Sequence, residues 1–321
     1  MKLLATLMAL ATAACGAPPP PAPPPIDRSE PHWQDVLDAT PELLVIVRPR
    51  ALRRDKVYGP LLRRAIEAAR QQSRVVAATR VLDALEDAGE LVVALRLEAP
   101  DRAGELVLIE RGVPGDVDPG ALVDDDGRPV WSPGPSGRVR ELVRERDDHG
   151  HPLDASLFEL PGRTWIIATG DARGRAREAL GHPFGRPPID PDPTALAVVR
   201  IDGPSLVSRV HALQDLGGLS AVGHHLRSVT LALPPGGEGS VMTTLVYDDE
   251  DAAALAEVAT QQVLAVLKRR GSNRLSWLVP ARVERPGKQL VLTSPLPPGL
   301  IDALLHAGSA PLPLDVDVPA P

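Results

Sequence analysis

Two short stretches of the chain, FELPGRTWIIAT (Phe158 to Thr169) and VERPGKQLVLTS (Val283 to Ser294), align without a gap. Both place glutamate, proline and glycine at matching positions, followed by a basic residue and an apolar run. Proline presets the backbone for a turn and glycine accepts positive φ, so Pro-Gly between extended runs predicts a β-hairpin. The sequence therefore predicts the same hairpin twice.

Similar elements precede each hairpin in the same order. An apolar strand, Glu42 to Pro49 or Ala195 to Asp202, is followed by a stretch with helical periodicity. Two strands come next in each copy, joined by turns that contain glycine. These strands are Leu91 to Leu97 with Glu105 to Arg111, and Ser228 to Leu233 with Ser240 to Tyr247.

A second helix is expected before each hairpin. It is short in the first copy, Arg138 to Arg146, and long in the second, Asp251 to Arg270. In the long helix the apolar residues recur at helical spacing and predict a buried stripe. The members of this stripe are Leu255, Val258, Ala259, Val263 and Val266.

A last helix after each hairpin completes the order β-α-β-β-α-β-β-α. This order predicts an α+β fold: a tandem duplication with largely antiparallel sheets and helices packed on one face. The first unit covers residues 35–185 and the second 190–310, with the proline-rich Gly181 to Thr194 as linker and 311–321 as a disordered C-terminal tail. One continuous sheet and two separate sheets both fit this pattern.

Composition narrows the function classes. The 321 residues are 43% hydrophobic but only 2% aromatic, so aliphatic side chains must fill the core. A formal net charge of -7 argues against nucleic acid as a partner, because such binding depends on phosphate neutralisation. The single cysteine, Cys15, leaves the globular part without a disulfide or a thiolate metal site.

The first fourteen residues, MKLLATLMALATAA, carry one charge at Lys2 and then an unbroken apolar run from Leu3 to Ala14. This run is too short to span a membrane and ends in small residues. Residues 1–14 are therefore predicted to be a signal peptide.

The segment Thr12-Ala13-Ala14-Cys15 resembles the lipobox of bacterial lipoproteins, whose cysteine is lipidated and becomes the first residue. Thr12 departs from the usual leucine, so cleavage after Ala11-Thr12-Ala13 without lipidation stays open. The resemblance implies a lipid anchor at Cys15 in the cell envelope, and Gly16 implies sorting to the outer membrane, facing the periplasm. Residues 15–34 would be the lipidated cysteine and a tether, in which Ala17 to Pro25 favours polyproline II.

Few segments suggest chemistry. Asp147-Asp148-His149-Gly150-His151 is a candidate metal site through His149 and His151, although a solvated helix end is the preferred interpretation. His224-His225 and Ser205 are interpreted as helix caps, and Asp124 to Gly127 as a turn. Glu159 and Glu284 could be symmetric acids, but an ion pair across each turn, to Arg163 or Lys288, is favoured. No cofactor is expected.

Seven basic residues gather after the first strand, against one acid in an otherwise acidic chain. They are Arg48, Arg50, Arg53, Arg54, Lys56, Arg63 and Arg64. A solvated helix face is the preferred interpretation, and contact of Arg53, Arg54, Arg63 and Arg64 with anionic headgroups is the alternative.

These observations favour a membrane-anchored, non-enzymatic envelope lipoprotein that binds an envelope protein or an apolar ligand, or serves as a scaffold. The alternative is a metal-assisted periplasmic hydrolase using His149 and His151.

Overall fold

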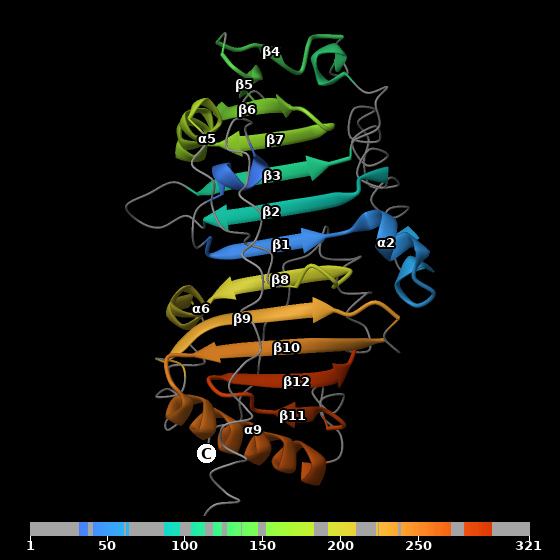
Figure 1. Cartoon of the computed structure of the whole chain (residues 1–321), viewed down its shortest axis with the longest axis vertical. Coiled ribbons are helices and arrows are strands. Elements are labelled where there is room, and N and C mark those ends of the chain that lie inside the picture. The colour runs from blue at the N-terminus through green and yellow to red at the C-terminus, as the bar shows by residue number, and fades with distance from the viewer. Residues whose placement is uncertain are drawn as a thin grey trace, which may run out of the picture.

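The structure is a computed structural model. It describes residues 32–37, 41–60, 62–63, 87–96, 104–112, 118–123, 127–135, 137–146, 152–182, 192–209, 223, 225–236, 239–270 and 279–296. Within these residues the chain forms one antiparallel sheet of twelve strands with few helices (Figure 1). The predicted antiparallel pairing is confirmed, and a large sheet with few helices fits an α+β or a mainly β class.

The sheet has the strand order β11-β12-β10-β9-β8-β1-β2-β3-β7-β6-β5-β4. The N-terminal half contains β1 (Leu43–Val47), β2 (Glu90–Arg96), β3 (Glu105–Arg111), β4 (Ser132–Pro133), β5 (Arg140–Arg146), β6 (Pro152–Leu160) and β7 (Thr164–Thr169). The C-terminal half contains β8 (Ala197–Asp202), β9 (Leu226–Leu233), β10 (Ser240–Tyr247), β11 (Arg282–Glu284) and β12 (Gln289–Pro295).

The two halves meet where β1 pairs with β8, from Leu43 opposite Ile201 to Val47 opposite Ala197. This pairing makes the sheet continuous, and Val45 opposite Val199 is its midpoint. From this midpoint outward the first five strands have the same order in each half, with β2, β3, β7 and β6 on one side and β9, β10, β12 and β11 on the other.

Both faces of the central strands are apolar. In β1, Leu44 and Ile46 point to one face, and Leu43, Val45 and Val47 to the other. An antiparallel strand that is half solvated alternates apolar with polar residues, so a continuous apolar run indicates that both faces are covered.

One face, here called the η1 face, carries the largest core. It is covered by the 3₁₀-helix η1 (Trp33–Val36) and by α5 (Asp171–Gly181). Sheet residues on this face include Leu44, Ile46, Val92, Ile109 and Ile166, all at most 1% exposed. Trp33, predicted to belong to the tether, is instead buried in this core.

The opposite face, here called the α9 face, is covered at several places. Helices α2 (Pro49–Arg54), α6 (Gly203–Arg209) and α9 (Glu250–Arg270) pack on it, next to Val47, Val229 and Leu245. At the far N-terminal edge, the segment around Trp131 packs there against Leu157, just beyond the short 3₁₀-helix η2 (Pro119–Ala121). The prediction that helices lie on one face is therefore wrong, because both faces are apolar.

The predicted helix at Arg138 to Arg146 is also wrong, since Arg140–Arg146 is strand β5. Without β5, the outer edge of the long strand β6 would have no ladder partner along its length. Pairing between strands overrides the weak local helix preference of this segment.

The long helix in the second half is confirmed as α9, but its buried stripe is not. Ala252, Ala253 and Ala256 face the sheet, whereas Leu255 and Val258 are 51% and 52% exposed. Small alanines allow the helix to approach β10 and β12 closely, and the larger apolar residues are left on the outside.

The two Pro-Gly hairpins are confirmed as β6–β7 and β11–β12, with Gly162 and Gly287 at positive φ. Their registers differ by one residue, because Glu159 lies opposite Trp165 whereas Glu284 lies opposite Val291. The last helix of the first unit is confirmed as α5. The last helix predicted for the second unit lies outside the described residues. The same holds for the predicted helical stretch around Ala65 to Ala69, for residues 1–31 and for the tail 311–321.

Candidate functional site

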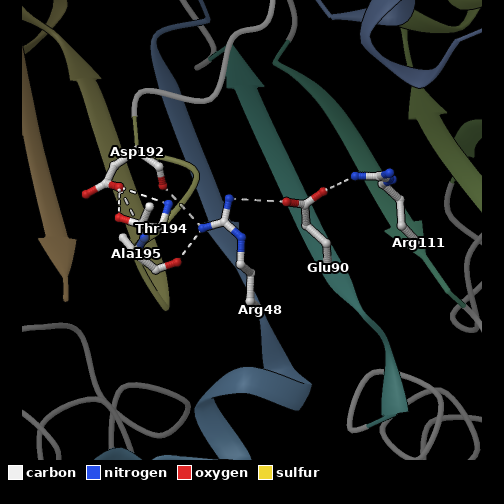
Figure 2. Close-up of polar contacts among 6 residues, drawn as sticks. All are labelled: Arg48, Glu90, Arg111, Asp192, Thr194 and Ala195. Atoms are coloured by element: carbon white, nitrogen blue, oxygen red, sulfur yellow. Dashed lines mark hydrogen bonds and ion pairs between the residues drawn. The ribbon is translucent and has the colours of Figure 1, made fainter. Parts of the chain in front are cut away.

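A row of charged side chains crosses the ends of β1, β2 and β3 on the η1 face (Figure 2). Arg48 Nη2 lies 3.3 Å from one oxygen of Glu90, and Arg111 donates to the other oxygen. Glu90 and Arg111 are directly opposite each other in the β2–β3 ladder. Both oxygens of this 15% exposed carboxylate are therefore occupied.

Arg48 also connects the two halves of the molecule. Its Nη1 donates to the main-chain carbonyls of Asp192 and Ala195, in the segment that leads into β8. That segment is shaped by the Asp192 side chain, which accepts hydrogen bonds from the amide and the hydroxyl of Thr194 at 3.0 and 2.7 Å. A guanidinium in a fixed geometry is suited to such multiple contacts.

A cavity of about 620 Å³ lies next to this row. Its polar lining is contributed by His32, Glu90, Arg111 and Thr164, and its apolar lining by Trp33, Leu160 and Pro161. Three glycines, Gly89, Gly112 and Gly162, complete the wall. The volume is within the range of about 300 to 1,000 Å³ that is common for small-molecule sites.

Arg111 is the cation of this cavity. Its guanidinium lies 5.1 Å from the centre of the Trp33 ring, and Glu90 holds its other side. A cation over an aromatic face gains electrostatic attraction and is held in place. The side chain is 42% exposed, so it remains open to a ligand.

His32 contributes an uncharged ring at neutral pH. Partial burial lowers the pKa of His32, Asp35 opposes this shift and the cation of Arg111 adds to it. Its Nδ1 accepts a hydrogen bond from the amide of Gln34 at 3.3 Å. The cavity thus combines one exposed cation with a neutral imidazole and an apolar wall.

The structure separates the residues of the basic segment. Arg48 belongs to the charged row, Arg50 donates to the carbonyl of Gly112 at 3.0 Å, and Arg53 pairs with Asp87 at 3.1 Å. Arg54 and Arg63 are exposed, and Arg64 lies outside the described residues. Since Gly112 lines the cavity, Arg50 is the residue of the basic segment that reaches the cavity wall.

Other candidates from the sequence are not brought together. Cys15, His149, His151, His224 and 124–126 lie outside the described residues. Among the residues that the structure does describe, no group of three His, Cys, Asp or Glu side chains could hold a metal ion.

The two hairpin glutamates are far apart. β6 and β11 are separated by nine strand spacings, about 40 Å, so Glu159 and Glu284 cannot share a cleft. Glu159 accepts a hydrogen bond from Arg140 of β5 at 2.8 Å, and Lys288 donates to the carbonyl of Asp248. The predicted ion pairs across the turns are therefore wrong.

Ser205 is not the cap of α6. The carboxylate of Asp202 accepts from both the amide and the hydroxyl of Ser205, at 3.1 and 2.8 Å. Asp202 is thus the N-cap, and Ser205 supports it.

Trp33, Glu90 and Arg111 were not predicted as site residues from the sequence. Glu90 directly precedes the predicted strand Leu91 to Leu97, and Arg111 ends the predicted strand Glu105 to Arg111, which is a weak signal that both lie at one edge of the sheet. Trp33 gave no such signal, because it precedes the first strand and is placed by tertiary packing alone.

No protein-family model matches the chain, and comparison with curated proteins and with solved structures returns no similar protein. No helix in the described part of the chain is both long and apolar enough to cross a membrane.

Proposed function

We propose that this chain is a lipid-anchored envelope lipoprotein whose globular part is a non-enzymatic binding module. The observation that supports this function best is the cavity of about 620 Å³ in which Glu90 and Trp33 hold the guanidinium of Arg111. A cation fixed before the ligand arrives loses little conformational freedom on binding, which favours affinity.

The lining indicates the chemistry of the ligand. The row of Arg48, Glu90 and Arg111 carries a net single positive charge, and His32 adds none at neutral pH. Trp33, Leu160 and Pro161 offer an apolar surface beside it. The ligand that fits is a small amphipathic molecule with one acidic group and an apolar body.

The proposed anchor lies close to this cavity along the chain. His32, which lines the cavity, is the first described residue, and the tether Ala17 to Pro25 would span about 28 Å if extended. Arg50 of the basic segment reaches the cavity wall at Gly112, and the exposed Arg54 and Arg63 of the same segment are suited to anionic headgroups. We infer that the cavity opens near the membrane to which Cys15 attaches the protein.

We also propose that residues 35–185 and 190–310 arose by duplication of one unit. The equal order of the first five strands on each side of Val45 and Val199 supports this origin. The ungapped sequence match of the two Pro-Gly hairpins supports it independently.

Calorimetric titration of the full chain in detergent tests the binding function. The probes are aryl and alkyl carboxylates, each paired with its uncharged amide. We expect carboxylates to bind about tenfold more tightly than their amides, because only they pair with Arg111. Arg111→Met should remove this difference, and Arg282→Met, on the distant strand β11, should retain it.

Equal affinity for carboxylate and amide, or no binding of any probe, would contradict the proposed ligand site. The anchor is tested separately by incorporation of labelled palmitate in cells. Labelling should be lost in Cys15→Ser, and an unlabelled wild-type chain would overturn the anchor without affecting the binding result.

A further inference from the structure

Helix α9 exposes an apolar stripe that no element of the described structure covers. Leu255 and Val258 are 51% and 52% exposed, and Val266 is 37% exposed. These residues lie along one side of the helix, at the spacing of an amphipathic face. The alanines that pack on β10 and β12 lie on another side. The stripe is therefore separate from the side of α9 that packs on the sheet.

The stripe ends in opposite charges. Asp251 lies on the same side of the helix in its first turn, and Arg269 lies on that side in its last turn. Each is nine residues from Thr260, so the two charges are symmetric about the middle of the helix. When such a stripe is placed antiparallel against a copy of itself, each acid meets a base at both ends.

We propose that α9 is a dimerisation helix, whose exposed stripe packs antiparallel against the same stripe of a second copy of this chain. With the two-fold axis near Thr260, Leu255 of each copy lies next to Ala265 and Val266 of the other. Val258 lies next to Gln262, and Asp251 pairs with Arg269. The inference goes beyond the ligand-binding function and does not depend on it.

The interface is small. The 21 residues of α9 span about 30 Å, so one helix face contributes less than the roughly 800 Å² per partner of a standard interface. The dissociation constant of the dimer in solution is therefore expected to be micromolar or higher. If the proposed anchor holds both copies on one membrane, their effective concentration rises and the dimer becomes the main form.

The first test is the concentration dependence of the dimer, measured on the full chain in detergent by native mass spectrometry and by light scattering. Val258→Lys places a charge in the stripe and should weaken the dimer about tenfold or more. Val263→Lys is the matched control, because Val263 is 43% exposed but lies about 90° around the helix from the middle of the stripe, on the side that carries Ala252 and Ala256. It should weaken the dimer much less than Val258→Lys does.

The second test is a charge swap. Asp251→Arg and Arg269→Asp should each weaken the dimer about fivefold, because like charges then face each other. The double variant should return to the wild-type constant, since each pair is restored with opposite polarity. Both changes oppose the helix dipole, so a gain in α9 stability cannot produce this rescue.

A chain that stays monomeric at all concentrations would overturn the proposal. So would a Val263→Lys dimer as weak as that of Val258→Lys, or a double charge variant as weak as the single variants. Circular dichroism of each variant shows whether the fold is retained.

Discussion

The two halves of the sheet place different side chains at matching positions of their first three strands. Where the N-terminal half has Arg48, Glu90 and Arg111 in a row, the pairing registers place Asp202, Ser228 and Val246 in the C-terminal half. Arg48 provides no side-chain cap for α2 and instead joins the charged row, whereas Asp202 caps α6. The cavity therefore comes from the side chains of the first half and is not a property of the shared strand order.

The halves also differ in the elements after their third strand. The N-terminal half extends the sheet by β4 and β5, which continue the ladder beyond β6. The C-terminal half inserts α9 at the corresponding point of the chain, between β10 and β11. One half therefore ends in extra strands and the other in a helix with an exposed apolar side.

The largest expected difference between the halves is in the stability that two ion pairs contribute. One pair joins α5 to β5, and the other joins α9 to the end of β11. Arg177 of α5 donates to both oxygens of Glu141 in β5, at 2.9 and 2.6 Å, and Ser156 adds a hydrogen bond at 2.6 Å. The carboxylate side chain is only 4% exposed. Although burial alone would raise the pKa of Glu141, the hydrogen bonds from Arg177 and Ser156 leave that pKa lowered.

Arg177→Ala should lower the free energy of unfolding by about 3 kcal/mol, because it leaves a buried carboxylate with one partner. The matched change in the other half is Arg285→Ala, which removes the 2.8 Å pair with Glu257 between β11 and α9. Both partners of that pair are about one-third exposed, so its loss should amount to less than about 1 kcal/mol. Equal losses in urea unfolding would contradict this contrast.

The second prediction concerns the residues that begin α2 and α6. Pro49 and Gly203 occupy matching positions after β1 and β8. A Cβ on Gly203 would lie 2.1 Å from the carbonyl oxygen of Leu226, so a backbone shift is unavoidable. Gly203→Ala should therefore lower the free energy of unfolding by about 2 to 3 kcal/mol.

Pro49→Ala is the comparison variant for this position. Proline is favoured in the first turn of a helix and alanine is tolerated there, so we expect a loss of about 1 kcal/mol. Thermal unfolding of both variants measures the difference. A Gly203→Ala chain as stable as Pro49→Ala would mean that the contact with Leu226 relaxes without loss.

Part of this fold could be predicted from the sequence, because it depends on local signals. The Pro-Gly turns at Gly162 and Gly287 and the apolar runs of β1 and β8 are such signals. The continuous run LLVIV of β1 also indicated cover on both faces, which the one-face interpretation overlooked.

The site could not be predicted in the same way. Glu90 follows Arg48 by more than forty residues, and only the register of β1, β2 and β3 brings these residues and Arg111 into one row. Strand β5 likewise depends on its pairing with β6, because RELVRER has no clear period of its own. Such pairings are long-range and leave no local pattern.

The smallest expected difference between the halves is in how the free energy of unfolding depends on pH. Glu110 of β3 matches Leu245 of β10 and is 6% exposed, with Oε1 lacking any hydrogen-bond partner. Burial raises the pKa of Glu110 to about 7. Below the ordinary pKa of 4.5 the carboxyl is protonated whether folded or unfolded, and no penalty arises. Between pH 4.5 and 7 only the unfolded chain releases its proton, so stability falls as the pH rises through this window.

Glu110→Leu, which introduces the residue of the second half, should remove this decline. Compared with wild type, the variant should gain about 2 kcal/mol more at pH 6 than at pH 4, as measured by urea unfolding at both values. Glu145→Leu is the control, because it makes the same substitution at a glutamate that lies exposed near the end of β5. If Glu110→Leu shifts stability equally at both pH values, the carboxyl does not titrate on folding, and the two halves differ here only in packing.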